Sequence, residues 1–160
     1  NVLEDNFIGV TLSNSSARFV NITLSGSTYR AAILSALGAG VIEGNTNPGA
    51  STSPPPHEFM LTDNLTTAGA TSTLGVNGIP YAIDLSSAKV VAGSGLIVSP
   101  GAHIKFGPNV LLDHLGMIQV GGAAAITTFS APTAGVQGIG LLAETGSHGT
   151  FSRVEFQGVS

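Results

Sequence analysis

The stretch LIVSPGAHIKFGPNVLLDHLGMIQVGGAAAITTF, residues 96–129, decides the fold class of this 160-residue chain. It consists of short β-prone apolar runs separated by Gly, Pro, Asn and Asp. Runs of about 4 such residues between turn formers are typical of strands rather than of helices. The stretch therefore predicts four strands, over residues 96–98, 104–106, 117–120 and 126–129.

Apolar residues also recur along the chain with a regular period. One ladder consists of Val76, Ile97, Ile118 and Ile139 at steps of 21, and another of Ile83, Ile104 and Ile126 at steps of 21 and 22. Ladders that share one period predict a coiled sheet, in which each turn carries several short strands and like residues stack in the interior. An antiparallel sandwich also has short strands and regular turns. Two ladders in step favour a parallel β-solenoid instead, with Ile97, Ile118 and Ile139 stacked inside it.

The order of the motifs adds a family resemblance. The motifs are GLIVSPGAHIKFG (residues 95–107), LGMIQVGG (115–122), ITTFSAP (126–132), GIGL (138–141) and FSRVEFQG (151–158). Their order resembles the right-handed parallel β-helix modules of bacterial secreted and cell-surface, adhesin-like repeat proteins, roughly from Tyr81 to Gly158. Those modules usually carry a Trp just before the Gly-Ile motif, where this chain has Val136 and Gln137. The resemblance implies an all-β, right-handed parallel β-helix, whose coils the two ladders set at about 21–22 residues, and it implies little about activity.

The composition limits the possible classes of function. Only 9% of the residues are charged, the net charge is -4 and the five Lys and Arg residues are scattered, so nucleic acid is a poor candidate partner. No apolar run approaches the roughly 18 residues that a membrane-spanning helix needs. The chain has no cysteine, which rules out disulfides and thiolate metal sites. Scarce charge, abundant Ser, Thr, Gly and Asn, and the resemblance together favour an extracellular or cell-surface location.

The pattern divides the chain into three parts. We interpret residues 1–28 as the terminal coils of a repeat, because their motifs G-V-x-L and F-x-x-I-x-L match residues 138–141 and 151–156. Residues 29–74 are interpreted as an insertion with a Pro-rich loop, in which residues 29–43 form either a short helix or a small-residue strand. Residues 75–160 are predicted to form β-helix coils. The matching ends favour a tandem array in a longer parent protein.

The sequence predicts no catalytic, cofactor-binding or metal-binding residue. Enzymes with the β-helix fold, such as pectate lyases, set several carboxylates on one sheet face, and none of the nine acidic residues here makes an i, i+2 pair on one strand. At a period of 21, Asp63 and Asp84 would stack in successive coils, where a Ca²⁺ site is conceivable but a pair of solvated loop carboxylates is the simpler interpretation. The histidines lack ligand spacing; they are His57, His103, His114 and His148. Because His103 alternates with Ile104, we expect it on the outer, solvated face.

Low charge, repetition and the lack of a site point to a structural role. We expect a non-catalytic segment of an extracellular repeat protein that builds a surface fibre, sheath or adhesin stalk by axial stacking of β-helix coils. Its partner would be itself, head-to-tail or through adjoining repeats. The alternatives are a carbohydrate-active or carbohydrate-binding module, with cell-surface glycans as its ligands, and a phage tail fibre. Three N-x-S/T sequons, at Asn14, Asn21 and Asn64, leave glycosylation open.

Overall fold

A computed structural model gives the structure of the chain and describes residues 2–4, 8–25, 30–46, 58–83, 86–131 and 139–157. These residues form a parallel β-solenoid, as the sequence predicts, and all pairings between the strands are parallel. The strands are β1 (Val2–Glu4), β2 (Ile8–Ser13), β3 (Arg18–Val20), β4 (Thr23–Ser25), β5 (Arg30–Ser35), β6 (Val41–Glu43), β7 (Phe59–Leu61), β8 (Asp63–Asn64), β9 (Thr71–Leu74), β10 (Tyr81–Ile83), β11 (Ala88–Val90), β12 (Gly95–Val98), β13 (His103–Phe106), β14 (Val110–His114), β15 (Met117–Gly121), β16 (Thr127–Ser130), β17 (Ile139–Ala143), β18 (His148–Ser152) and β19 (Val154–Gln157).

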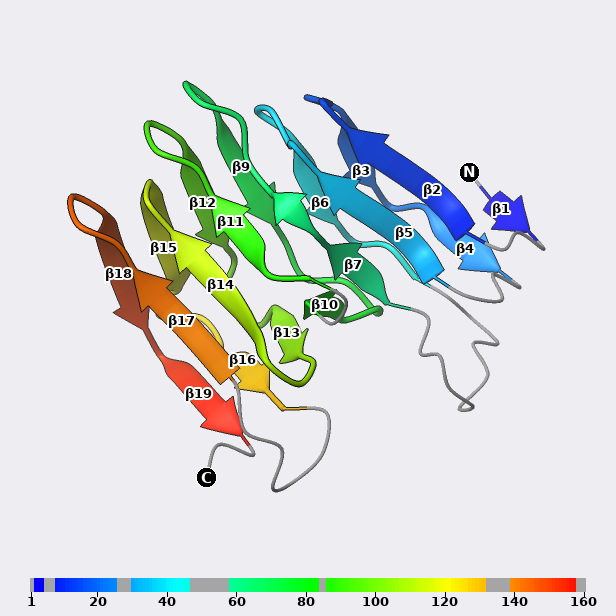
Figure 1. Ribbon diagram of the computed structural model, residues 1–160. Coiled ribbons are helices and arrows are strands. Elements are labelled where there is room, and N and C mark those ends of the chain that lie inside the picture. The colour runs from blue at the N-terminus through cyan, green and yellow to red at the C-terminus, as the bar shows by residue number, and fades with distance from the viewer. Residues whose placement is uncertain are drawn as a thin grey trace.

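The strands of successive coils form three long sheets (Figure 1). The seven-stranded sheet has the order β2-β5-β7-β10-β13-β16-β19, the six-stranded sheet β3-β6-β9-β12-β15-β18, and the four-stranded sheet β8-β11-β14-β17. Strands β1 and β4 form a small two-stranded sheet at the N-terminal end. From β7 onward the chain visits each long sheet in turn, and a strand inside a sheet pairs with its counterparts in the coils before and after it.

The register of the strands differs from the predicted 21-residue period. Leu96, and not Ile97, lies opposite Ile118, so this step is longer than predicted by a single residue. Ile139 pairs with Val110 and belongs to the four-stranded sheet, whereas Ile118 belongs to the six-stranded sheet. The predicted stack of Ile97, Ile118 and Ile139 is therefore wrong, although Ile118 itself is fully buried.

The second predicted ladder fails for the same reason. Ile104 pairs with Tyr81 and Phe129 rather than with Ile83 and Ile126. Ile126 lies just before β16 and is exposed. The corners between strands differ in length from coil to coil, so the step varies, and a shift of a single residue turns a side chain to the opposite face of a sheet.

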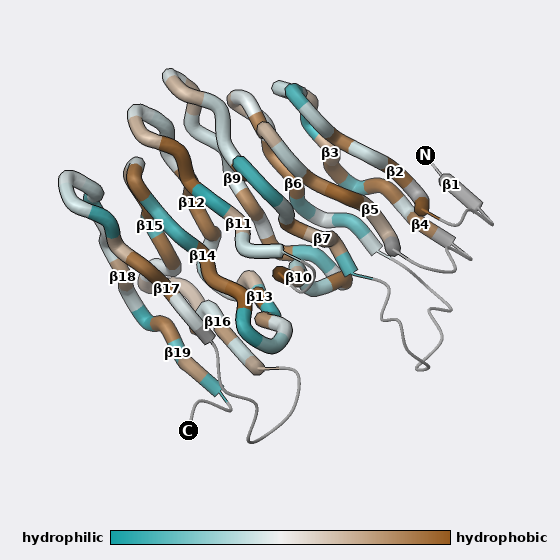
Figure 2. Tube along the Cα trace, in the orientation of Figure 1, coloured by the Kyte–Doolittle hydropathy of each residue, from teal (hydrophilic) through white to brown (hydrophobic). Residues whose placement is uncertain are grey.

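Two ladders of apolar and aromatic side chains, most of them large, fill the interior instead. In the six-stranded sheet the ladder is Phe19, Ile42, Leu74, Val98, Val120 and Phe151. In the seven-stranded sheet it is Val10, Ala32, Phe59, Tyr81, Ile104, Phe129 and Phe156. Figure 2 shows hydrophobic stretches recurring on the strands of one coil after another. Burying one such Val, Leu, Ile or Phe side chain stabilises the fold by about 1.5–3 kcal/mol.

Aromatic rings pack against one another along the last three strands of the seven-stranded sheet. The ring centroids of Phe106 and Phe129 lie 5.7 Å apart, and those of Phe129 and Phe156 lie 5.3 Å apart. Both separations fall within the range in which aromatic pairs add about 0.5–1.5 kcal/mol beyond the area that they bury. The ladder ends at Phe156, which is 49% exposed.

A buried polar network ties together two corners of the coil. Asn45 is fully buried, and its Oδ1 accepts a hydrogen bond of 2.9 Å from the backbone N–H of Ile22. Its Nδ2 donates to the carbonyl of Phe19 and to Oδ1 of Asn77, both at 2.9 Å. The Tyr81 hydroxyl accepts from Nδ2 of Asn77, and burial raises the pKa of this hydroxyl well above its usual value. The network thus satisfies polar groups that the interior would otherwise leave unpaired.

Residues 30–43, the described part of the segment 29–43, form strands rather than a helix. Strands β5 and β6 lie in the seven-stranded and six-stranded sheets and continue them without a break. The Pro-rich stretch lies outside the described residues.

The internal match between the two ends of the chain is only partly reflected in the fold. Phe19 and Phe151 are both in the six-stranded sheet. The other pair of matched motifs falls on β2 and β17, which belong to different sheets.

Candidate functional site

The outer face of the four-stranded sheet carries a group of polar side chains beside a hollow. In β14 buried residues alternate with more exposed ones, so Leu112 faces the interior while Asp113 faces outward. The parallel register places Asn64, Lys89 and Asp113 opposite one another on β8, β11 and β14. A row of an amide, an ammonium and a carboxylate therefore crosses three coils.

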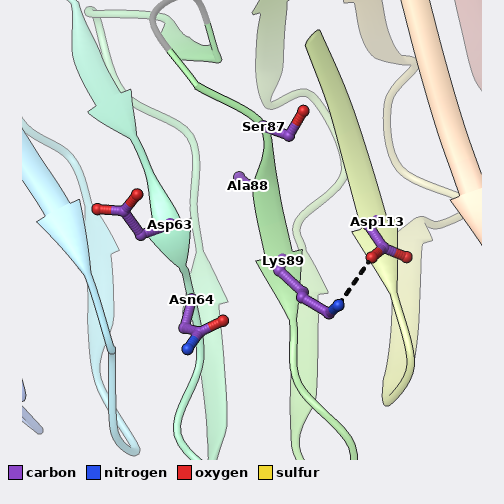
Figure 3. A pocket seen from close by; sticks show the side chains of 6 residues that line it. All are labelled: Asp63, Asn64, Ser87, Ala88, Lys89 and Asp113. Atoms are coloured by element: carbon purple, nitrogen blue, oxygen red, sulfur yellow. Dashed lines mark ion pairs between the residues drawn. The ribbon is translucent and has the colours of Figure 1, made fainter.

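These side chains line an open groove of about 400 Å³ (Figure 3). The groove is bounded by Asp63, Asn64, Ser87, Ala88, Lys89 and Asp113. Lys89 Nζ lies 3.1 Å from Asp113 Oδ2. The Asp113 side chain is only 16% exposed, and its Oδ1 is buried without a hydrogen-bond partner among the described residues. The groove thus offers donors and acceptors of hydrogen bonds side by side, with one carboxylate oxygen unsatisfied.

The predicted stack of Asp63 on Asp84 does not form at the expected step. Asp63 pairs with Ala88 in the next coil, and Asp84 lies outside the described residues. Asp63 has a φ of 55°, a conformation that Asp and Asn tolerate better than most residues. Among the described residues, no three His, Asp or Glu side chains gather as a metal site would require.

The histidines occupy different environments. His103 faces outward, as expected from its alternation with Ile104, but it is half-buried rather than fully solvated. Its Nε2 lies 2.7 Å from Ser130 Oγ on β16. Burial lowers the pKa of His103, and the neighbouring Lys105 lowers it further. The His103 ring thus lies beside a hydroxyl in surroundings that favour its neutral form. Sequence reasoning missed this pairing because His103 and Ser130 lie on different coils.

Two further histidines contrast with His103. His114 lies inside the coil, 2% exposed, and neither of its ring nitrogens has a hydrogen-bond partner in the part of the chain that the structure describes. His148 is exposed at the start of β18. His57 lies outside the described residues.

The C-terminal end of the coil forms a second candidate site. In the described chain, β17, β18 and β19 are each the last strand of their sheet and have a pairing partner on one side only. These strands expose Leu142, Phe151 and Phe156, at 43%, 41% and 49% respectively. Unpaired strand edges beside exposed aromatic rings form a surface on which a further parallel strand can pair.

The sequons lie at accessible positions. Asn14 and Asn21 are exposed, with φ of 50° and 54°, directly after β2 and β3. Asn64 is exposed within the groove.

Comparisons with known proteins give no further assignment. No family model matches the chain, and neither a curated protein nor a solved structure gives a significant match. The part of the chain that the structure describes has no helix with the length and hydropathy to cross a bilayer.

Proposed function

We propose that the chain is a non-catalytic structural segment of an extracellular repeat protein, and that it builds a fibre, sheath or adhesin stalk by axial stacking of its coils. The observation that carries the proposal is the C-terminal coil. Its three strands have unpaired edges in the described chain and expose Leu142, Phe151 and Phe156. In the bacterial adhesin-like modules that the chain resembles, the coil is right-handed, and the proposal takes the same hand for this chain.

Axial stacking also accounts for the sparse charge. A soluble monomer spreads charges over its surface and keeps exposed apolar patches small. Only 9% of the residues here are charged, and β18 is exposed along its whole length. A further coil on this end would pair the free backbone groups and cover the two Phe rings, which is how each earlier coil is stabilised by its neighbour.

Electron microscopy and light scattering on the purified 160-residue chain test the proposal. We expect end-to-end particles whose mean length rises with protein concentration. Phe151→Lys places a charge in the end surface and should keep the protein monomeric. Met117→Lys is the matched control, because Met117 is similarly exposed but faces outward on β15, which is paired on both sides. A monodisperse monomer at all concentrations, or equal assembly of the two variants, would overturn the proposal.

The groove on the four-stranded sheet favours a second candidate, the binding of cell-surface glycans. Sugar hydroxyls both donate and accept hydrogen bonds, and the groove presents the Lys89 ammonium, the Asn64 amide and the Asp113 carboxylate within one hollow. Titration of neutral and acidic oligosaccharides, followed by NMR, should shift the amide signals of β8, β11 and β14. Lys89→Met should weaken these shifts, whereas Gln119→Ala, on the outer face of the six-stranded sheet, should leave them unchanged. Spectra that do not change with any oligosaccharide would exclude this candidate.

A further inference from the structure

The corner between β9 and β10 carries the one Asn-Gly dipeptide of the sequence, at Asn77 and Gly78. Asn is among the thermolabile residues of proteins. Its side-chain amide is most open to attack when Gly follows it, because Gly has no Cβ to hinder the approach of its own backbone nitrogen. Gly78 is exposed, so water reaches this corner. The dipeptide therefore has the chemistry of a modification site, and it lies apart from the groove on the four-stranded sheet.

The reaction needs only the chain itself and water. The Gly78 nitrogen gives up its proton and bonds to Cγ of Asn77, while the bond from Cγ to Nδ2 breaks. Ammonia leaves, and a succinimide ring closes. Water then opens the ring at either of its two carbonyls. The product carries an aspartate at position 77, with the main chain running either through its backbone carbonyl or through its side chain.

In the folded coil both reacting groups are held by hydrogen bonds. Oδ1 of Asn77 accepts from the backbone N–H and from Nδ2 of Asn45, each at 2.9 Å. Nδ2 of Asn77 donates to the carbonyl of Gly75 at 3.2 Å and to the Tyr81 hydroxyl. The attacking nitrogen of Gly78 donates its own N–H to the carbonyl of Asn45 at 2.9 Å. Ring closure must therefore break hydrogen bonds at the amide and at the nitrogen together.

We propose that Asn77 is a self-modification site that the fold keeps closed and that unfolding of the β9–β10 corner opens. While the corner is folded, its hydrogen bonds keep the amide intact. When the corner opens, the Gly78 nitrogen is free to attack and the amide is lost. Because the ammonia diffuses away, each chain that has unfolded for long enough keeps a permanent record of it.

A modified chain cannot restore the network. The new carboxylate has no N–H group, so the carbonyl of Gly75 and the hydroxyl of Tyr81 lose the donor that Nδ2 of Asn77 supplies. The Tyr81 hydroxyl has one hydrogen, and the carbonyls of Ile42 and Gly75 lie 2.8 and 3.0 Å from its oxygen. Turning this hydrogen toward the carboxylate takes it from those carbonyls. An acceptor is left unpaired whichever way the hydroxyl turns, and the corner gains a charge.

Mass spectrometry of the peptide that contains Asn77 tests the protection. The protein is incubated at mildly alkaline pH, once folded and once in urea. The wild-type chain should lose the Asn77 amide at least about tenfold faster in urea, because native structure opens such a corner only rarely.

Gly78→Ala is the matched control. A Cβ on Gly78 would lie 3.5 Å from the carbonyl oxygen of Asn45 and 3.5 Å from Cγ2 of Thr46, which is ordinary contact. This variant should fold like the wild type and keep every hydrogen bond of the corner. Its added methyl group hinders the attack, so it should lose the amide slowly in both states.

Refolding tests the consequence of the modification. After a long incubation in urea, the refolded fraction of the wild-type chain should fall in step with the loss of the Asn77 amide, whereas Gly78→Ala should refold fully. Asn77→Asp mimics one product directly and should unfold at lower urea concentration than the wild type. Its control, Asn64→Asp, changes an exposed side chain and should unfold at the wild-type concentration.

Three results would overturn the proposal. Equal rates of amide loss in the folded protein and in urea would show that the fold gives no protection. Full refolding of modified wild-type chains would show that the network tolerates the product, and so would wild-type stability of Asn77→Asp. None of these results depends on whether the chain assembles into fibres.

Discussion

Replacing Asn45 with Ala should destabilise the protein severely, even though it removes only a small polar side chain. The side chain of Asn45 satisfies the N–H of Ile22 and the carbonyl of Phe19, and both contacts measure 2.9 Å. Truncation would leave the buried carbonyl of Phe19 and the part-buried N–H of Ile22 without the side chain that they bond. Each such group costs about 1–3 kcal/mol, so the expected loss is about 2–6 kcal/mol. A loss of this size is a large part of the ~5–15 kcal/mol that stabilises an ordinary domain.

The measurement combines urea unfolding, followed by circular dichroism, with amide hydrogen exchange at Ile22. Asn64→Ala is the matched control, because Asn64 is exposed and should change the free energy of unfolding by no more than about 0.5 kcal/mol. Exchange at Ile22 should accelerate in Asn45→Ala and stay slow in the control. Equal stability of the two variants, with Ile22 still protected, would refute the role given to the network.

Four further predictions concern packing in the interior, unfolding at alkaline pH and catalysis. Ile118→Asp should cost more than about 4 kcal/mol in urea unfolding because it buries an unpaired charge, and wild-type stability would contradict the inward position of Ile118. Phe129→Ala should cost about 3–5 kcal/mol, and Phe156→Ala roughly half as much because Phe156 is half-exposed; equal costs would contradict the ladder. Burial raises the pKa of the Tyr81 hydroxyl in the folded protein. The free energy of unfolding should therefore be constant below the pKa of about 10 that Tyr has in the unfolded chain, and should fall as the pH rises above that value. Ultraviolet titration should show Tyr81 ionising only together with unfolding, and ionisation in the folded state would contradict this. The purified protein should release no unsaturated product from polygalacturonate with Ca²⁺, and a Ca²⁺-dependent rise in absorbance would overturn the proposal that the chain is non-catalytic.

Local sequence signals predict the strands well. The runs at 96–98, 104–106 and 117–120 all fall within strands, and residues 127–129 of the fourth run do so too, because turn formers bound them on both sides. The outward position of His103 beside the buried Ile104 follows from simple alternation. Both signals depend only on residues that are close together in the sequence.

The register between strands could not be predicted from such local signals, because it depends on the lengths of the corners, and the corners carry no apolar pattern. The period of 21 selects Ile97, which pairs with Gln119, in place of its neighbour Leu96, which faces Ile118. Both residues are aliphatic and adjacent, so hydropathy alone does not tell the inward one from the outward one.

The candidate sites depend on the register and could not be predicted without it. His103 and Ser130 are on different coils and meet only because β13 and β16 pair with Lys105 opposite Ser130. Likewise, the groove exists because β11 and β14 pair with Lys89 opposite Asp113. The alternation and turn signals that identify single strands do not measure the length of the step between two coils.

The hydrogen bonds between coils lie in sheets whose strands succeed one another along a single axis. A tensile load applied between the two ends would therefore act on the pairing between each coil and the next. We expect the strands of a terminal coil to separate before those of the inner coils. The register gives steps from 22 residues between β12 and β15 to 32 residues between β6 and β9. Each released coil would therefore add about 75–110 Å of slack at the ~3.3–3.6 Å per residue of extended chain. A stalk built in this way would yield by stepwise lengthening and absorb repeated pulls without being severed.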